Sequence, residues 1–273
     1  MPELPEAETL VRGLRPLISG ATIDTVDVHH ADVLRMAPDA FSERVVGRQI
    51  TGVGRRAKNV LLHLNDGELV VNLGMTGWLA PFGFDDRERT RPTHPAITFA
   101  MIGGARLVFD DVRRFGCVEA LDSETWQARS DQMGPEPLEA DFTVEVLSAS
   151  LGRSRTPIRN WLLDQRRIAG VGNIYACEAC FLARVHPERP ASTLTRREAQ
   201  DLRNGVVQVL STAVNAGGTT IRNYRNVHGE SGAYVDRLVV YGREAQPCVE
   251  CGVAIERIVL SNRSAFFCPS CQR

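Results

Sequence analysis

The segment CVECGVAIERIVLSNRSAFFCPSC, residues 248–271, decides the fold of the C-terminal end of this chain. Two Cys-x-x-Cys pairs, Cys248 with Cys251 and Cys268 with Cys271, are separated by sixteen residues. This is the spacing of a zinc ribbon, in which two knuckles hold one ion with four thiolates. Two disulfides are the alternative, which a cytoplasmic chain disfavours. We therefore expect one structural zinc ion in a closed site without an open catalytic position.

The residues between the two knuckles predict a β-hairpin. GVAIERIVL and SAFF read as short alternating strands, and SNR is the turn, which places Arg263 at the hairpin tip. A further pair, Cys177 and Cys180 in CEAC, lies in a predicted helix and has no second knuckle to complete a zinc site. We interpret these two thiols, and Cys117 in its apolar stretch, as core residues.

Composition indicates an ordinary globular protein that has room for one large domain or two smaller ones. The chain has 273 residues, of which 43% are hydrophobic and 24% charged. None of its apolar runs approaches membrane-spanning length, and its first residues are acidic where a secretory signal would be basic. We expect a cytoplasmic protein without a membrane partner.

Charge is distributed unevenly along the chain. Residues 1–149 hold 15 basic and 23 acidic side chains, a net −8, whereas residues 150–273 hold 17 and 10, a net +7. A basic C-terminal half suits a polyanion, although chance segregation of solvated faces explains it equally well. Of the 32 basic residues only Lys58 is a lysine. Lysine can give up a proton and arginine does not, so a chemical role for Lys58 competes with that of an ordinary surface turn.

The N-terminal stretch MPELPEAETL predicts a helix but leaves one residue unexplained. Pro5 suits the first helical turn, the acidic residues suit the positive end of the helix dipole, and Leu10 and Leu14 belong to an apolar stripe. These rules do not account for Pro2.

The rest of the chain divides into a β-rich part and a helical part. Short alternating runs over residues 20–130 predict an antiparallel sandwich or barrel. In RRIAGVGNIYA, glycines permit a tight turn, Asn173 can cap the next helix, and the helix start can bind phosphate. Turn-and-cap geometry alone is the commoner explanation of this motif. A basic cluster just upstream favours phosphate binding: Arg153, Arg155, Arg159, Arg166 and Arg167.

Seven motifs together resemble the bacterial formamidopyrimidine-DNA glycosylase family, within the wider Fpg/Nei family. They are MPELPEAETL, LGMTGWL, DDVRRFG, AGVGNIYACEACF, GGTTIRNY, VVYGREAQPCVECG and FFCPSCQ, and they extend from the first residue nearly to the last. The resemblance implies an α+β fold. An N-terminal helix and an antiparallel β-sandwich form a catalytic domain over residues 1–132, and 133–142 are a linker. A helix-two-turn-helix domain over 143–236 carries a lesion-recognition loop, 217–236, and 237–273 form the β-hairpin zinc finger.

The resemblance also implies an activity. It indicates a bifunctional glycosylase and AP lyase that removes oxidised purines, such as 8-oxoguanine and formamidopyrimidines, from duplex DNA and cleaves the strand by β,δ-elimination. Removal of Met1 would free the secondary amine of Pro2 as the nucleophile. Glu3 resembles the acid that protonates the sugar ring oxygen, Glu6 a supporting residue, Lys58 the catalytic lysine, and Arg263 the zinc-finger arginine that grips phosphate. We expect a monomer, associated with DNA, that uses zinc and no organic cofactor.

Further residues resemble the family's DNA contacts. Met75, Arg113 and Phe115 resemble the set that fills the space left by an everted nucleotide. Contacts to phosphate and backbone are implied for His94, Arg155, Asn173 and Tyr241. One departure is Asn72, which stands where the family commonly has histidine in HLGMTG, so a phosphate contact there is in doubt.

Two other functions remain open from the sequence. The endonuclease VIII branch shares the proline, the helix-two-turn-helix and the zinc hairpin but excises oxidised pyrimidines. A non-catalytic zinc protein that binds damaged DNA would keep the four cysteines and the basic half, but it would not need Pro2, Glu3 and Lys58 together.

Overall fold

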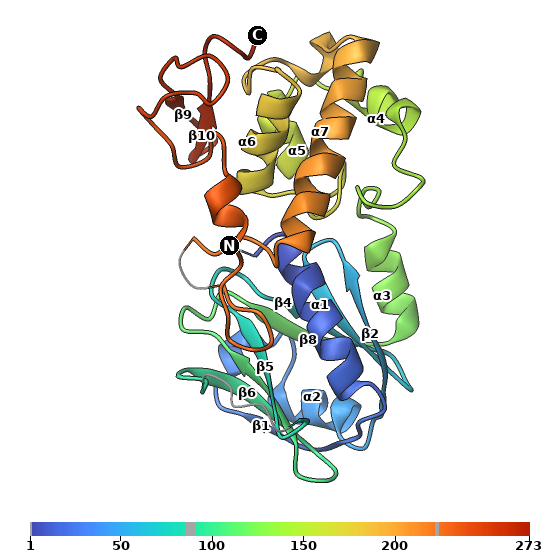
Figure 1. The fold of residues 1–273 in the computed structure, drawn as a ribbon. Coiled ribbons are helices and arrows are strands. Elements are labelled where there is room, and N and C mark those ends of the chain that lie inside the picture. The colour runs from blue at the N-terminus through green and yellow to red at the C-terminus, as the bar shows by residue number, and fades with distance from the viewer. Residues whose placement is uncertain (1, 86–90, 222–223) are drawn as a thin grey trace. The chain divides into compact units, whose positions relative to one another are not determined.

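The computed structural model describes residues 2–85, 91–221 and 224–273. The chain forms two compact units. The first comprises Met1–Gln132 together with Ala216–Ala233, and the second Met133–Asn215 together with Tyr234–Arg273 (Figure 1). Within the described ranges, none of the helices is both long and apolar enough to cross a bilayer.

Helix α1 (Leu4–Ile18) opens the first unit and packs on the strands beside it (Figure 1). Pro5 lies in its first turn, where a missing N–H costs no helical hydrogen bond. Glu3 and Glu6 form a capping box that satisfies backbone N–H groups at the helix start. Leu10 and Leu14 are fully buried along one stripe, so burial of this stripe fixes the helix against the sheet.

Two antiparallel four-stranded sheets form the body of the first unit. One has the order β1-β6-β7-β5 and the other β2-β3-β4-β8, which makes a sandwich of two open sheets and excludes the barrel alternative. The strands of the first sheet are β1 (Ile23–Val28), β6 (Pro95–Met101), β7 (Arg106–Asp110) and β5 (Trp78–Phe82). Those of the second are β2 (Ile50–Arg56), β3 (Asn59–Leu64), β4 (Glu68–Asn72) and β8 (Cys117–Leu121).

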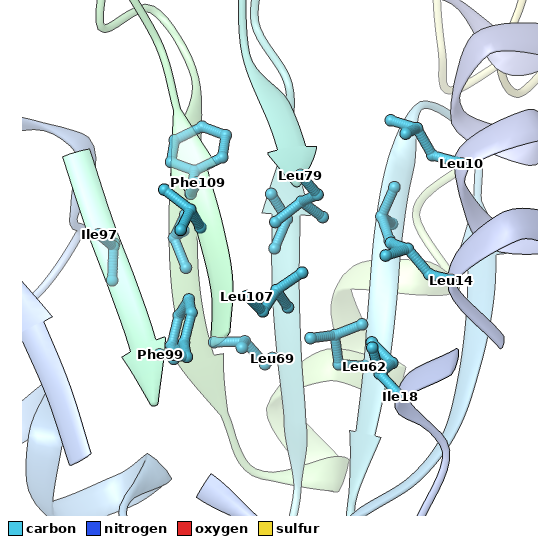
Figure 2. Packing of buried hydrophobic residues seen from close by; sticks show 14 of the residues in the cluster. Leu10, Leu14, Ile18, Leu62, Leu69, Leu79, Ile97, Phe99, Leu107 and Phe109 are labelled. Carbon is cyan, nitrogen blue, oxygen red and sulfur yellow. The ribbon is translucent and has the colours of Figure 1, made fainter. Parts of the chain in front are cut away.

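The core of the sandwich is filled by large apolar side chains from both sheets and from α1. Phe99 and Phe109 of one sheet and Leu62 and Leu69 of the other are fully buried, and Figure 2 shows Ile18 of α1 beside Leu62 in the same cluster. Burying side chains of this size stabilises the unit by about 1.5–3 kcal/mol each. Short helices complete the unit: η1 (Ala31–Val33), α2 (Pro38–Val45) and α3 (Ser123–Ser130).

The second unit is helical and ends in a hairpin. Its helices are α4 (Val144–Leu151), α5 (Ile158–Leu163), α6 (Asn173–Leu182), η2 (Ala191–Thr193), α7 (Arg196–Asn215) and η3 (Tyr234–Arg237). Strands β9 (Glu256–Leu260) and β10 (Arg263–Phe267) pair antiparallel, with Arg263 opposite Leu260. Ser261 and Asn262 between them both have positive φ, 46° and 59°, as a two-residue hairpin turn requires. The turn is therefore one residue shorter than the predicted SNR, and Arg263, expected at the hairpin tip, is the first residue of β10 directly beside it.

Two segments pack differently from the expected domain plan. Residues 216–233, most of the predicted recognition loop, belong to the first unit, where the Val227 side chain lies against Gly13 and a Cβ at Gly13 would approach it to 2.5 Å. Pro135, in the predicted linker, accepts a hydrogen bond from the Ala169 amide at 3.0 Å, so this segment is packed within the second unit. The outer domain boundaries remain a prediction.

Candidate active site and DNA-binding surfaces

The start of α1 brings two buried carboxylates next to Pro2. Pro2 is buried, and Glu3 and Glu6 are each 1% exposed. The Glu6 carboxylate accepts a hydrogen bond from the Glu3 amide at 2.7 Å and another from the Thr219 amide at 2.7 Å. Glu6 therefore fixes the backbone beside Pro2 and ties it to the beginning of the 216–233 segment. Met1 lies outside the described residues.

Several described residues of the 216–233 segment contact Glu6 and Trp78. Gly218 has a φ of +84°, and a Cβ there would lie 3.0 Å from Glu6 Oε1, so glycine is needed on both grounds. The Tyr224 hydroxyl donates to the Glu6 carbonyl at 3.3 Å, and Trp78 Nε1 donates to the Asn226 carbonyl at 2.8 Å. The segment is thus fastened at several points, although its residues 222–223 lie outside the described part of the chain.

Lys58 stands in the turn between β2 and β3 and is half-buried. Ala57 before it has a φ of 54°, which produces the tight turn. Arg55, with a side chain only 7% exposed, pairs with Glu8 of α1 at 3.0 Å and donates to the Ala57 carbonyl at 2.9 Å. One guanidinium therefore holds the Lys58 turn to the helix that begins beside Pro2.

Met75, Arg113 and Phe115 come together on the surface of the first unit. Met75 is 39% and Phe115 59% exposed, so neither is a core residue. Arg113 Nη1 lies 3.4 Å from Met75 Sδ, and its guanidinium carbon lies 4.4 Å from the centre of the Phe115 ring. An exposed apolar pair joined by a cation over an aromatic face is suited to insertion among DNA bases.

Asn72 and His94 have defined surroundings in the same unit. The Asn72 side chain donates to Asn59 Oδ1 at 2.9 Å and accepts from the Gly74 amide at 3.0 Å, so it shapes the turn that precedes Met75. The His94 side chain is exposed, while its amide donates to Asp110 Oδ1 at 2.5 Å. Burial raises the pKa of Asp110 above its usual range, and the His94 amide opposes that rise.

The second unit corrects two expectations about the basic segment. Asn173 does not cap α6, whose N-cap is Gly172; its amide instead donates to the Ser264 carbonyl at 3.0 Å and its oxygen accepts from Arg159. Arg159 is fully buried and does not belong to a surface cluster. Both side chains bond to backbone carbonyls of the hairpin instead of facing solvent: Arg159 donates to the Leu260 and Ser264 carbonyls, and Asn173 donates to that of Ser264. Arg155, by contrast, is exposed as a phosphate contact requires.

The four cysteines of the hairpin lie in a tetrathiolate arrangement. Their Sγ atoms are all within 4.8 Å of one another; Cys248 and Cys271 are 3.9 Å apart, and Cys251 and Cys268 3.5 Å. Tetrahedral zinc with bonds of about 2.3 Å places sulfurs about 3.8 Å apart, whereas a disulfide requires about 2.05 Å. The cluster fits a structural zinc ion. The other three cysteines are buried core thiols, as predicted: Cys117, Cys177 and Cys180.

Comparison with known proteins identifies the family. Models of the formamidopyrimidine-DNA glycosylase N-terminal domain, of the corresponding H2TH domain, and of a zinc finger found in FPG and IleRS match residues 1–118, 133–225 and 245–273. The formamidopyrimidine-DNA glycosylase of Desulforamulus reducens is 43% identical, with 100% of this chain and 99% of the relative covered. That of Streptococcus pneumoniae is 41% identical, with 100% and 99% covered.

The chain belongs to the formamidopyrimidine-DNA glycosylase family. Solved structures agree with this membership. The MutM (FPG) protein of Thermus thermophilus superposes with a TM-score of 0.88 at 40% identity, covering 99% of this chain and 98% of that one. A Lactococcus lactis FPG mutant in complex with Fapy-dG-containing DNA superposes with 0.91 at 30% identity, and both chains are fully covered. Family membership makes the chain a DNA-repair glycosylase with a zinc finger.

Among the described residues, three further charged side chains are buried, and the sequence did not predict their burial. Glu178, in α6, accepts hydrogen bonds from the amides of Val239, Val240 and Tyr241 at 2.8–3.0 Å, and burial raises its pKa. It thereby holds the backbone of Tyr241, whose ring packs on Phe266 at 5.1 Å. Arg159 and Asp111 are the other two. The available signal was that Glu178 and Asp111 lie inside two of the quoted motifs, AGVGNIYACEACF and DDVRRFG, but a sequence does not show which charge will be buried with hydrogen-bond partners.

Proposed function

We propose that the Pro2 nitrogen, freed by removal of Met1, is the nucleophile that excises oxidised purines from duplex DNA. The observation that carries the proposal is a potential secondary amine placed directly before two buried carboxylates at the start of α1. An N-terminal amine has a reference pKa of roughly 7.7 to 8.0, so a part of it carries a free lone pair near neutral pH. The amine bonds to the sugar C1′ while the bond from C1′ to the damaged base breaks.

The acid–base roles follow from this first step. Glu3 donates a proton to the sugar ring oxygen, which opens the ring and leaves a Schiff base on the Pro2 nitrogen. Glu6, which holds the Glu3 amide, keeps this acid in place. The Schiff base makes the adjacent C–H acidic, so the bonds to the 3′ and then the 5′ phosphate oxygens break by successive elimination. Lys58 supports proton transfer, and exposed Arg263 binds the phosphate that flanks the lesion and assists the second elimination.

Met75, Arg113 and Phe115 support eversion of the damaged nucleotide. Eversion costs a few kcal/mol of stacking and pairing, which inserted apolar groups and a cation facing the unpaired base offset in part. Their mutual contacts and exposure on the first unit favour this role.

Phosphate binding is assigned to His94, Arg155, Asn173 and Tyr241. Such contacts position the duplex without reading its sequence, and the +7 charge of residues 150–273 favours the same polyanion. Both ends of the Asn72 side-chain amide already bond within the protein, so we assign Asn72 no phosphate contact. The Asn173 side chain is engaged in the same way, so we assign its phosphate contact to its backbone N–H at the start of α6. We further propose that the protein works in the cytoplasm as a monomer bound to DNA.

One excision assay tests the proposal and its alternatives together. Duplexes that carry 8-oxoguanine, a formamidopyrimidine or an oxidised pyrimidine at the same position are incubated with the enzyme, and free base and strand scission are measured separately. We expect release of both purine lesions followed by strand cleavage. Preferred release of the pyrimidine would support the endonuclease VIII alternative, and tight binding without release would support a non-catalytic protein.

A further inference from the structure

We propose that Asp111 is a positioning residue that clasps the turn carrying Met75 to the turn carrying Arg113 and Phe115. The clasp makes the three exposed side chains enter the duplex as one preformed unit. This inference rests on the proposed role of the three residues in nucleotide eversion.

The Asp111 carboxylate lies where the two turns meet. It directly follows β7, is 1% exposed, and faces donors from both turns. From the first turn, the Thr76 hydroxyl donates to Oδ1. From the second, the Arg113 amide donates to Oδ1 at 3.3 Å and the Gly116 amide to Oδ2 at 2.7 Å.

Thr76 adds a second link between the turns. Its hydroxyl donates to Asp111 and accepts from the Arg113 amide at 3.2 Å, so the oxygen bridges the carboxylate and the neighbouring backbone. The Asp111 carbonyl also accepts from the Arg114 amide at 3.2 Å, which closes the second turn. Met75 is thus next to a residue, Thr76, that bonds to this carboxylate, and Arg113 bonds to it through its own amide.

The backbones of the two turns are in direct contact as well. Gly74 has a φ of +57°, and a Cβ there would lie 2.4 Å from the Gly116 nitrogen. A Cβ at Gly116 would lie 2.9 Å from the Asn72 carbonyl oxygen and from Asp111 Oδ2. There is therefore no room for a side chain between the two turns. The position of one turn relative to the other depends on the hydrogen bonds around the Asp111 carboxylate.

The chemistry requires a group that only accepts hydrogen bonds. An ionised carboxylate offers two acceptor oxygens, whereas a carboxamide replaces one of them with a donating NH₂ that would face an amide N–H. Without the clasp, the two turns would have to become ordered when the protein binds DNA. The free-energy cost of this ordering would reduce the binding free energy that is available for eversion.

The test compares variants that remove single partners of the clasp. Thr76→Val removes the donating hydroxyl with little change in volume, Thr76→Ser retains it, and Asp111→Asn replaces an acceptor with a donor. Eversion is followed by fluorescence of 2-aminopurine beside an 8-oxoguanine in duplex DNA. Excision from the same duplex and strand cleavage of a single-stranded abasic oligonucleotide are measured in parallel.

We expect Thr76→Val and Asp111→Asn to slow eversion and duplex excision by about tenfold or more, with little change in single-stranded cleavage, and Thr76→Ser to behave as wild type. Phe115→Ala should add little to Asp111→Asn, because residues that act through one another are not additive. Normal eversion in a folded Thr76→Val variant, or a full additive loss on combining Phe115→Ala with Asp111→Asn, would overturn the proposal. If wild-type enzyme released no 8-oxoguanine, the proposed function would fail, and this outcome is distinct from failure of the clasp.

Discussion

Glu6 and Thr219 are joined by a 2.7 Å hydrogen bond although they lie 213 positions apart in the sequence. This bond fastens the start of the 216–233 segment to the helix that begins beside Pro2. A residue that the sequence motifs indicate as a supporting acid is therefore also the attachment point of the predicted recognition loop. The bond gives Glu6 two backbone partners, since it also holds the Glu3 amide.

Glu6→Gln should loosen this attachment. The carboxamide can accept with one oxygen, so one of the two buried amides is left unpaired at a cost of about 1–3 kcal/mol. We expect faster hydrogen exchange at the Thr219 amide and reduced excision of purine lesions. Glu43→Gln, at an exposed site in α2, serves as the control. Unchanged exchange at Thr219 in the Glu6 variant would show that the bond does not hold the loop.

Lys58→Arg separates charge from proton transfer. Arginine preserves the positive charge but does not deprotonate near neutral pH, so a purely electrostatic role predicts near-normal turnover. We expect excision or strand cleavage to fall by about 10²-fold or more, the size of a lost acid–base contribution. Single-turnover rates of both steps measure this. Wild-type rates on both steps would show that Lys58 acts only through its positive charge.

Zinc content distinguishes the two kinds of cysteine. Cys248→Ser removes a thiolate from the cluster and should lower both the bound zinc and the affinity for DNA, because the hairpin that carries Arg263 loses its anchor. Cys177→Ser is the matched control: its thiol is buried in the core, and burial raises its pKa to about 11. It should retain zinc. Equal zinc loss from both variants, measured by metal analysis, would contradict the division of the cysteines into zinc ligands and core thiols.

The start of α7 should show a pH-dependent stabilisation. Two hydrogen bonds from Arg189 lower the pKa of Glu198 to about 2, against about 4.3 in an unfolded chain. Because the folded pKa is depressed, the stabilisation is present above the unfolded value and is lost as pH falls toward 2. Glu198 is 30% exposed, so solvent screening limits it to roughly 1 kcal/mol.

Thermal midpoints of wild type and Glu198→Gln measure this effect. The Tm difference should be largest near pH 7 and should shrink steadily from about pH 4.5 towards pH 2, because in this range Glu198 takes up a proton in the unfolded chain but stays ionised in the folded one. Glu188→Gln, at an exposed position nearby in sequence, controls for the loss of one acidic group. A Tm difference that stays constant with pH would refute the assigned role of the ion pair.

Local patterns predicted the parts of the fold that local physics determines. Cysteine spacing indicated the zinc cluster, alternation indicated the antiparallel strands, and Pro5 with its acidic neighbours marked the start of α1. The position of residues 216–233 was missed because it depends on Val227 finding Gly13 and Thr219 finding Glu6, which are contacts distant in sequence.

The buried charges were missed for a related reason. Arg159 reads as one member of a basic cluster, and its burial becomes evident only when the Ser264 and Leu260 carbonyls of the hairpin are seen around its guanidinium. Asn173 was expected to cap its own helix, yet the same distant Ser264 carbonyl receives its amide. A sequence pattern shows that a group is polar but does not show which distant partner it meets.

The most direct test of the whole account is borohydride trapping on duplex DNA that contains 8-oxoguanine, followed by peptide mapping of the trapped complex. Borohydride reduces a Schiff base to a stable amine, so the covalent bond marks the nucleophile. The account predicts cross-linking at the Pro2 nitrogen of a chain that has lost Met1, and weaker trapping by Pro2→Gly, which replaces the secondary amine with a primary one. Cross-linking at Lys58, or undiminished trapping when Met1 is retained, would contradict it.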